Sequence, residues 1–229
     1  MKKFAIIVAG GIGKRYSNTI PKQFDILCGK PVLMHSVEAF HRSIPDIDII
    51  IVLAESLQNE WNKLCQAYNF SIPHKLTPGG SERFYSVKNG LALVDQDGIV
   101  GIHDAARPLI SDEIIIRTYD LASVYKAVVP VVEISDSVRK IEGQDNEPVD
   151  RTKLRLVQTP QVFMTSILKK AYEQQYNESF TDDASVVEAS GVNIFLTKGD
   201  TENIKITRAA DLVVAEALKK YQQGYENQK

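Results

Sequence analysis

The feature that most constrains the fold of this chain is an alternation of short apolar runs with segments of helical periodicity. Strands are expected at residues 4–8, 47–53, 99–103, 127–132 and 192–196. Helices are expected at residues 32–40, 57–69, 83–93, 112–124, 165–176, 183–190 and 208–221. This alternation predicts an α/β fold, in which helices flank a mostly parallel, twisted sheet.

The first apolar run leads directly into a glycine-rich loop, Ala9-Gly-Gly-Ile-Gly13, which is followed by Lys14, Arg15 and Lys22. Glycines let backbone N–H groups approach phosphate oxygens closely, and the nearby cations neutralise further negative charge. The pattern therefore predicts a cradle for several phosphates. An ordinary glycine turn with solvated cations is the alternative interpretation.

The spacing of this loop excludes two well-known nucleotide-binding motifs. A Walker loop needs Ser or Thr after Gly-Lys, but Arg15 follows Lys14, and Val8 stands where the first glycine is required. A dinucleotide fingerprint needs a third glycine where Tyr16 stands. NAD and FAD are therefore not expected as ligands.

Size and charge narrow the class of protein. With 229 residues, the chain is expected to form one domain over residues 1–229. The net charge of −2 gives no field that would gather nucleic acid or a membrane surface, so a monomeric nucleotide fits better than a polymer. The two cysteines lack metal-ligand spacing, and no apolar run has the length of a signal or membrane segment, so we expect a cytoplasmic protein.

Asp104 follows the expected strand at 99–103, at the sheet edge where α/β proteins bind ligands. A carboxylate there could hold Mg²⁺, or another divalent cation, against phosphate oxygens. A surface ion pair between Asp104 and Arg107 is the alternative, and His103 is expected to pack in the core. A second small-residue turn, Pro78-Gly-Gly-Ser81 followed by Ser86, suits the recognition of a base edge, although it could simply begin a helix.

Residues 137–156 break the alternation because they are unusually polar. They predict two short strands, at 137–141 and 149–156, joined by a turn at 142–148. Such a hairpin cannot lie in the middle of a sheet, and an isolated pair of strands is marginal in water. We therefore expect a projecting arm that makes a homodimer, with a loose surface excursion as the alternative.

No nucleophile–base pair of the triad type is encoded, so the expected chemistry is positional and electrostatic. Phosphoryl and nucleotidyl transfers are of this kind. Six motifs, taken together and in this order, also indicate nucleotidyl transfer. Through them the chain resembles the 2-C-methyl-D-erythritol 4-phosphate cytidylyltransferase family over essentially its whole length. They are Ala9-Gly-Gly-Ile-Gly-Lys-Arg15 with Pro21-Lys-Gln23, Gly79-Gly80, His103-Asp-Ala-Ala-Arg-Pro108, Thr159-Pro-Gln161, Thr181-Asp-Asp-Ala-Ser185 and Asn203-Ile-Lys-Ile-Thr207.

The resemblance implies a Rossmann-like nucleotidyltransferase fold and the transfer of a cytidylyl group from CTP to 2-C-methyl-D-erythritol 4-phosphate. It implies that Arg15, Lys22, Arg151 and Lys205 are catalytic, and that Asp104 holds the metal. Its nucleotide site comprises Ala9, Gly10, Gly11, Gly13, Gly80, Ser81, Ser86 and Asp104. The acceptor site implied by the family comprises Arg107, Ser137, Arg151, Thr159 and Lys205, of which Ser137 and Arg151 would act from the neighbouring subunit.

Some positions depart from the family's pattern. Gly10 replaces a frequent alanine, Ser81 a frequent acidic residue and Ser137 a frequent threonine, but no charge that the chemistry needs is lost. A ribitol 5-phosphate cytidylyltransferase is the alternative within the same chemistry. A catalytically silent nucleotide-binding or regulatory domain is the alternative from another class, against which the intact Lys22 and Lys205 argue.

Overall fold

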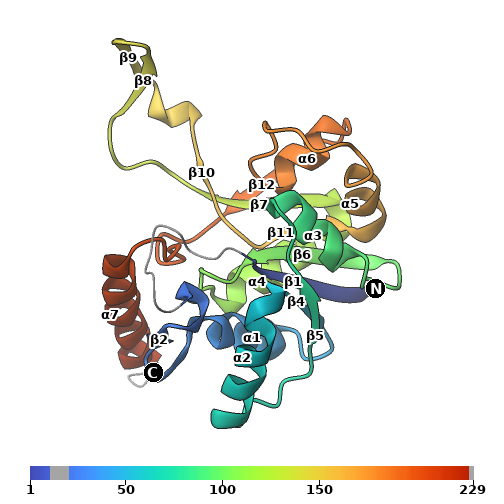
Figure 1. Ribbon diagram of the computed structural model, residues 1–229. Helices are drawn as coiled ribbons and strands as arrows, with labels where there is room; N and C mark the ends of the chain where they lie inside the picture. The colour runs from blue at the N-terminus through green and yellow to red at the C-terminus, as the bar shows by residue number, and fades with distance from the viewer. Residues whose placement is uncertain (11–20, 227–229) are drawn as a thin grey trace.

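The computed structural model describes residues 1–10 and 21–226, and it is built around one mixed sheet (Figure 1). The strands of this sheet are β1 (Lys2–Ala9), β4 (Asp48–Leu53), β5 (Lys75–Pro78), β6 (Gly98–Asp104), β7 (Ala127–Val132), β10 (Leu156–Val157), β11 (Gln161–Met164) and β12 (Phe195–Lys198). Two hairpins pair β2 (Ile26–Leu27) with β3 (Lys30–Pro31), and β8 (Val138–Glu142) with β9 (Asp145–Val149). The helices are α1 (Val32–Ser43), α2 (Glu55–Ala67), α3 (Arg83–Leu91), α4 (Asp112–Tyr125), α5 (Thr165–Ala171), α6 (Asp183–Ala189) and α7 (Ala209–Glu226), with short 3-10 helices η1 (Lys22–Phe24) and η2 (Arg151–Lys153).

The strand order confirms the predicted, mostly parallel sheet. It runs β5-β4-β1-β6-β11-β7, and β7 also pairs with β10 and β12. Among the described strands of this sheet, only β10 and β11 run antiparallel to their neighbours. Strand β1 is central, since Ile6 pairs with Ile50 of β4 on one side and with Ile102 of β6 on the other. Because helices also pack against both faces of β1, the strand is buried on every side, which explains why its sequence is continuously apolar.

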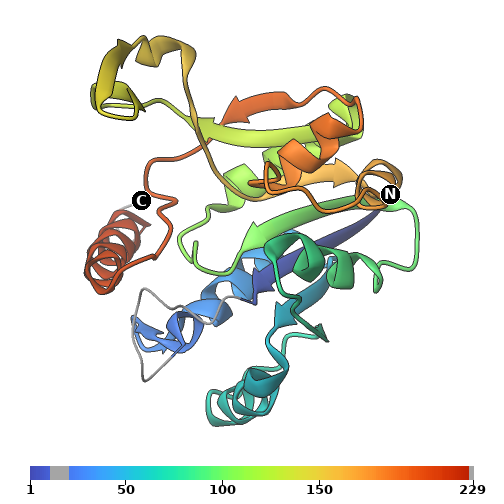
Figure 2. The ribbon, with the colours of Figure 1, turned by 45° about the horizontal axis from the view of Figure 1, so that its top comes forward.

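Helices cover both faces of the sheet (Figure 2), and the side chains of β1 alternate between them. Ala5 and Ile7 join one apolar cluster, to which α1, α2 and α4 contribute. Phe4 and Ile6 join a second cluster on the opposite face, to which α3, α5 and α6 contribute. The parallel register of β1 and β6, in which Val8 pairs with Asp104, places the carboxyl ends of the two strands side by side.

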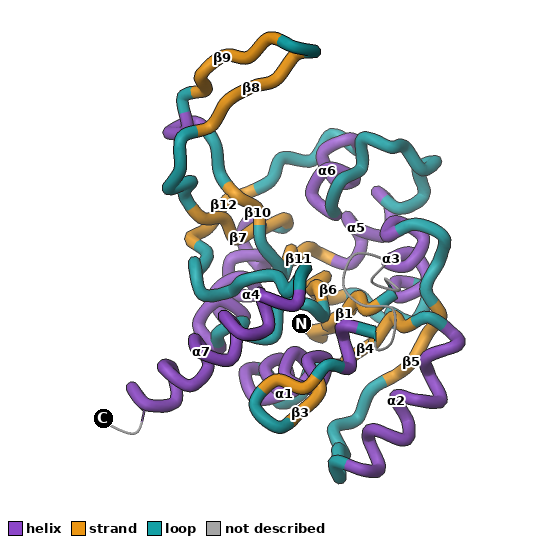
Figure 3. The backbone as a smooth tube through the Cα atoms, turned by 60° about the vertical axis from the view of Figure 1, so that its left-hand side comes forward, coloured by secondary structure: helices purple, strands orange, loops and turns teal. Residues whose placement is uncertain are grey.

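Helix α7 returns the end of the chain to that edge of the sheet (Figure 3). A third apolar cluster joins Ala215 of α7 to Leu27 of the β2–β3 hairpin and to Ile206. The N–H of Ile206 donates to the carbonyl of Ala106 at 2.8 Å, which fastens the segment before α7 beside the end of β6. Lys205 is brought to the same edge by these contacts.

Several local predictions are wrong. Strands β5 and β11 were not expected, β12 begins three residues later than predicted, and α5 ends at Ala171. The predicted arm strand at 149–156 is divided into η2 and β10, and the arm turn is only two residues long, because β8 ends at Glu142 and β9 begins at Asp145. The β8–β9 hairpin nevertheless projects away from the sheet, as Figure 1 shows. In the described part of the chain, no helix has both the length and the apolar character needed to cross a membrane.

Candidate active site

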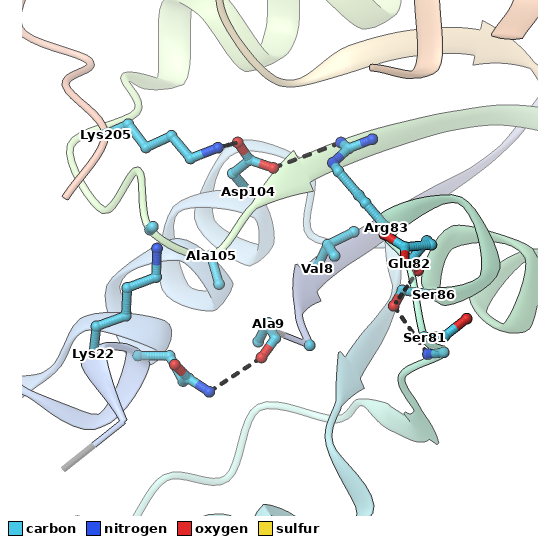
Figure 4. Close-up of a pocket in the computed structure, with 14 residues that line it drawn as sticks. Val8, Ala9, Lys22, Ser81, Glu82, Arg83, Ser86, Asp104, Ala105 and Lys205 are labelled. Atoms are coloured by element: carbon cyan, nitrogen blue, oxygen red, sulfur yellow. Dashed lines mark hydrogen bonds and ion pairs between the residues drawn. The ribbon is translucent and has the colours of Figure 1, made fainter. Parts of the chain in front are cut away.

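A cleft of about 260 Å³ opens at the carboxyl ends of β1 and β6 (Figure 4). The end of β1, the turn before α3, the end of β6, η1 and the segment before α7 all contribute to its wall. The side chains and backbone that line it belong to Val8, Ala9, Gly10, Lys22, Gln23, Gly80, Ser81, Glu82, Arg83, Ser86, Asp104, Ala105, Ala106 and Lys205.

Asp104, the last residue of β6, is the charged centre of this cleft. Its Oδ2 lies 2.6 Å from Nζ of Lys205, and its Oδ1 lies 3.6 Å from a guanidinium nitrogen of Arg83. The side chain is only 13% exposed, so burial disfavours the carboxylate form. Arg83 and Lys205 outweigh that effect and hold the pKa of Asp104 well below its ordinary value. Asp104 is therefore a carboxylate throughout the physiological pH range. The alternative of a surface ion pair with Arg107 is wrong, because Arg83 and Lys205 are the partners of Asp104.

Lys22 adds a second ammonium to the same cleft. Its Nζ donates to the carbonyl of Ile206 at 3.4 Å. Burial and the positive charge of Lys205 lower the pKa of Lys22, and Asp104 only partly opposes them. A polyanion in the cleft would reverse this effect, because it would stabilise both ammonium groups.

The turn before α3 presents mainly backbone to the cleft. The N–H of Gly80 donates to Oγ of Ser86 at 3.0 Å, and that hydroxyl donates in turn to the carbonyl of Glu82 at 3.2 Å. A Cβ on Gly80 would lie 2.3 Å from Cβ of Tyr85, so only glycine fits this close approach. Ser81 is exposed at the rim and does not cap α3, because Glu82 occupies the N-cap position without a side-chain bond.

The structure brings many of the predicted site residues together, but not all of them. Those that line the cleft are Ala9, Gly10, Lys22, Gly80, Ser81, Ser86, Asp104 and Lys205. Arg107 and Thr159 lie immediately behind Asp104, where the Asp104 N–H donates to Oγ1 of Thr159 at 3.1 Å. Gly11, Gly13 and Arg15 lie outside the described residues.

Ser137 and Arg151 do not line this cleft. Ser137 is exposed just before β8, and Arg151 lies in η2 at the base of the arm. The Arg151 guanidinium donates to the carbonyl of Ser135, and with Arg155 it lines a separate hollow beside β7 and β12. Within one chain, these two predicted acceptor contacts are therefore apart from Lys205.

Sequence reasoning missed Arg83, the first residue of α3. Its guanidinium donates to Oδ2 of Asp183 at 2.7 Å, and the hydroxyl of Tyr172 donates to Oδ1 of the same carboxylate at 2.6 Å. Burial opposes the charge of Arg83, but Asp183 and Asp104 together raise its pKa above the ordinary value. The signal that could have found Arg83 is its place at a helix start three residues after the paired glycines.

Contacts between two of the sequence motifs, Thr159-Pro-Gln161 and Thr181-Asp-Asp-Ala-Ser185, hold Asp183 in place. Gln161 of β11 donates from Nε2 to Oδ2 of Asp182 at 2.8 Å and accepts the N–H of Ala184 at 2.9 Å. Asp182 forms a capping box with Ser185 at the start of α6. The Thr159-Pro-Gln161 and Thr181-Asp-Asp-Ala-Ser185 motifs therefore fix one helix start, which sets the carboxylate that holds Arg83.

The donor set limits which metal could bind. No group of three or more His, Cys, Asp or Glu side chains suited to a metal exists among residues 1–10 and 21–226. Among the described residues, two carboxylates line the cleft, those of Glu82 and Asp104. Glu82 is the N-cap residue of α3, whereas Asp104 lies at the end of β6. Mg²⁺ commonly binds through one or two carboxylates together with substrate phosphates, so the residues present fit that ion when phosphates complete its ligands.

The sheet and the cationic cleft at its carboxyl edge, centred on one carboxylate, are those of a nucleotidyltransferase. The family model described as 2-C-methyl-D-erythritol 4-phosphate cytidylyltransferase matches residues 4–220, and the chain belongs to this family. The relative of that name from Bacteroides fragilis is 51% identical over 218 residues, which are 95% of this chain and 100% of the relative. The one from Porphyromonas gingivalis ATCC 33277 is 43% identical over 219 residues, which are 95% of this chain and 97% of the relative.

Solved structures of the same family share the fold. The 2-C-methyl-D-erythritol 4-phosphate cytidylyltransferase of Francisella tularensis is 30% identical, with a TM-score of 0.78 over 94% of this chain and 98% of its own. That of Thermus thermophilus is 29% identical, with a TM-score of 0.74 over 95% of this chain and 98% of its own. The resemblance that the motifs indicated is therefore confirmed at the level of the family and the fold.

Proposed function

We propose that this chain transfers the cytidylyl group of CTP to 2-C-methyl-D-erythritol 4-phosphate. The products are 4-diphosphocytidyl-2-C-methyl-D-erythritol and pyrophosphate, in the non-mevalonate route to isoprenoid precursors. The observation that carries the proposal is the convergence of Lys22 and Lys205 on one cleft, around Asp104, in a member of this family. The relatives named above are named for the same activity.

The proposed reaction needs no nucleophile from the protein. An oxygen of the acceptor phosphate, already ionised, attacks the α-phosphorus of CTP, and the bond to the bridging oxygen breaks so that pyrophosphate leaves. The protein's contribution is to align the two phosphates and to stabilise the negative charge of the transition state. We assign the charge stabilisation to Lys22 and Arg15, and the positioning of the acceptor phosphate to Lys205.

The nucleotide is assigned to the wall formed by Ala9, Gly10 and the turn before α3. The Ser86 hydroxyl proton is committed to Glu82, so Ser86 can only accept from the base, and its main task is to hold Gly80 in place. The backbone of Gly80 and Ser81 is then left to contact the base. Gly11 and Gly13 complete the phosphate loop in this proposal.

Mg²⁺ is proposed as the cofactor, held by Asp104 together with the phosphates of the nucleotide. When bound, it would neutralise phosphate charge beside the reacting centre. Lys205 lies 2.6 Å from Oδ2 of Asp104, so its ammonium would compete with the ion for this oxygen.

We further propose a homodimer in which the arm, about residues 137–156, completes the site of the other subunit. The strands of the β8–β9 hairpin are almost entirely exposed, and Ser137 and Arg151 do not reach the cleft of their own chain. The test mixes two impaired variants, Lys22→Ala and Arg151→Ala. Hybrid dimers with one intact site should recover part of the activity, whereas no recovery after verified subunit exchange would contradict a shared site.

The decisive experiment for the function is a pyrophosphate-release assay with CTP and Mg²⁺. It compares 2-C-methyl-D-erythritol 4-phosphate with ribitol 5-phosphate as the acceptor, and UTP with CTP as the donor. Release that depends on the methylerythritol ester supports the proposal. Release with ribitol 5-phosphate alone would assign the alternative substrate, and CTP binding without any release would favour a regulatory nucleotide-binding role.

Two further proposals rest on the sequence together with this fold. We take residues 1–229 as one nucleotidyltransferase domain, since the first strand, β1, and the last, β12, belong to the same sheet. A cytoplasmic location stays a prediction, which fractionation of cells that produce the protein would test.

A further inference from the structure

A buried chain of hydrogen bonds lies directly behind Asp104. His103 is fully buried, and both of its ring nitrogens have partners. Nε2 lies 3.1 Å from the carbonyl of Arg107, and Nδ1 lies 3.0 Å from Oγ1 of Thr159. The same threonine oxygen accepts the N–H of Asp104 at 3.1 Å.

The direction of each bond in this chain follows from the chemistry of its partners. A carbonyl oxygen only accepts, so the ring proton of His103 must lie on Nε2. The ring is fully buried and neither of its nitrogens contacts a carboxylate of the described residues, so it is neutral and Nδ1 is an acceptor. Thr159 therefore donates its hydroxyl proton to Nδ1, and its oxygen is free to accept from Asp104.

We infer that His103 and Thr159 are positioning residues for the reaction proposed above: they fix the backbone of Asp104 and so place its carboxylate between Arg83 and Lys205. The inference rests on the proposed function. It also revises the part assigned to Thr159 by family resemblance. Its hydroxyl proton points into the core, so the side chain cannot donate it to an acceptor substrate while this chain of bonds is intact.

The backbone of Thr159 extends the same network to Lys205. The side chain of Asn203, which is fully buried, donates to the carbonyl of Thr159 at 3.0 Å. The carbonyl of Asn203 accepts from Arg107 at 2.7 Å. Thr159 therefore accepts hydrogen bonds both from Asp104 and from the segment that carries Lys205. This shared anchor sets the distance between the carboxylate and the ammonium.

A purely structural role for His103 is the competing explanation, because its ring also packs edge-on against Phe40, with 5.1 Å between ring centroids. The two explanations differ in what a substitution must preserve. Packing needs only the volume of the side chain. Positioning needs an acceptor at the place of Nδ1 and a hydroxyl on residue 159.

The test compares variants that keep shape with variants that keep the hydrogen bond. Thr159→Val retains the shape of threonine without its hydroxyl, whereas Thr159→Ser retains the hydroxyl. His103→Leu fills the space without an acceptor, whereas His103→Asn presents Oδ1 near the place of Nδ1. The matched control is Thr118→Val, because Thr118 is also fully buried and its hydroxyl bonds within α4, away from the cleft.

Thr159→Val and His103→Leu should lower kcat by about 10- to 100-fold, the usual effect of losing a group that orients a ligand residue. CTP affinity, measured by calorimetry, should change much less than kcat. Thr159→Ser and His103→Asn should recover most of the lost kcat, and the control should keep the wild-type value. Wild-type kcat in folded Thr159→Val, or no difference between the Ser and Val variants, would overturn the inference.

Amide hydrogen exchange at Asp104 supplies a readout that does not depend on turnover. The Asp104 N–H should exchange faster in Thr159→Val than in the wild-type protein or in Thr159→Ser. If the wild-type protein releases no pyrophosphate, the proposed function fails, yet this measurement still reports whether the hydroxyl holds Asp104. If His103→Leu does not fold, the Thr159 variants alone decide the question.

Discussion

Replacing Arg83 by methionine tests how the wall of the cleft is held together. Asp183 is fully buried, and Arg83 is the only cation paired with it among the described residues, at 2.7 Å. Methionine matches much of the arginine stem but leaves this carboxylate without a counter-charge. Removing one partner of a buried ion pair costs about 3–5 kcal/mol. In a chain of this length, that loss corresponds to a fall in Tm of about 6–20 °C.

The expected loss is separated from packing effects by a double-mutant cycle. The free energy of unfolding is measured by urea denaturation for the wild-type protein, Arg83→Met, Asp183→Asn and the double variant. In the double variant the buried charge is gone, so we expect most of the stability to return and a coupling energy of at least about 2 kcal/mol. The control is the same cycle on Arg42 and Asp112, which form an exposed pair and should couple by less than about 1 kcal/mol.

Additivity would refute this reasoning. If the double variant loses the sum of the two single losses within about 0.5 kcal/mol, Arg83 and Asp183 do not act as a unit. If Arg83→Met is as stable as the wild-type protein, Asp183 is not an uncompensated buried carboxylate in that variant. Either result would remove the explanation given for the Thr181-Asp-Asp-Ala-Ser185 motif.

The remaining predictions concern the cleft. Gly80→Ala should weaken CTP binding about tenfold or more in calorimetry, because its Cβ would lie 2.3 Å from Cβ of Tyr85 and displace the turn, and unchanged affinity would contradict the backbone role of Gly80. In the wild-type protein, CTP affinity should fall as pH rises through the pKa of Lys22, which is below the ordinary value of 10.5. Lys22→Arg stays protonated and should lose this dependence, and a dependence that persists in Lys22→Arg would assign it to another group. Lys22→Ala should lower kcat by about 10²–10³ with a smaller change in the CTP KM, and unchanged turnover would remove its assigned role. Calorimetric titration with Mg²⁺ should show weak binding to the protein alone and tight binding with CTP, whereas tight binding without nucleotide would mean ligands beyond Asp104.

The sequence predicted the central strands well and the peripheral ones poorly, for a physical reason. Strands β1, β4, β6 and β7 lie inside the sheet, so burial on both faces demands the apolar runs that identified them. Strand β11 also lies inside but begins with Gln161, a buried polar residue whose amide is needed at the start of α6. Hydrophobic patterns cannot predict a strand that begins with a buried polar residue whose hydrogen bonds go to a neighbouring helix.

The arm shows the same limit on a smaller scale. Its polar composition correctly predicted that it leaves the sheet. The break after β9 depends on Asp150, whose side chain accepts the N–H of Thr152 at 3.1 Å and begins η2. A capping contact this local cannot be read from strand periodicity, so the residue pattern predicted one strand at 149–156 where the structure has the end of β9, the short helix η2 and the start of β10.

Within the site, the residues predicted from chemistry alone were those close to a glycine turn or a strand end. Asp104 was placed by the rule that ligands bind at the carboxyl ends of parallel strands. Arg83 was missed because its partner Asp183 lies 100 residues further along the chain, where no spacing rule connects them. The role of Lys205 came from the family resemblance, and its proximity to Asp104 depends on α7 packing against the β2–β3 hairpin.

The two cleft lysines differ in a way that bears on their assigned roles. The positive charge of Lys205 is already balanced in the free protein, because its ammonium lies 2.6 Å from the carboxylate of Asp104. Lys22 contacts a carbonyl at 3.4 Å and, within the described residues, no carboxylate, so burial and the charge of Lys205 make its ammonium less stable in the free protein than in water. An ammonium that is poorly compensated before substrates bind, and that is stabilised more as negative charge accumulates, lowers the barrier more than it strengthens ground-state binding. For this reason we expect the replacement of Lys22, unlike that of Lys205, to affect turnover more than nucleotide affinity.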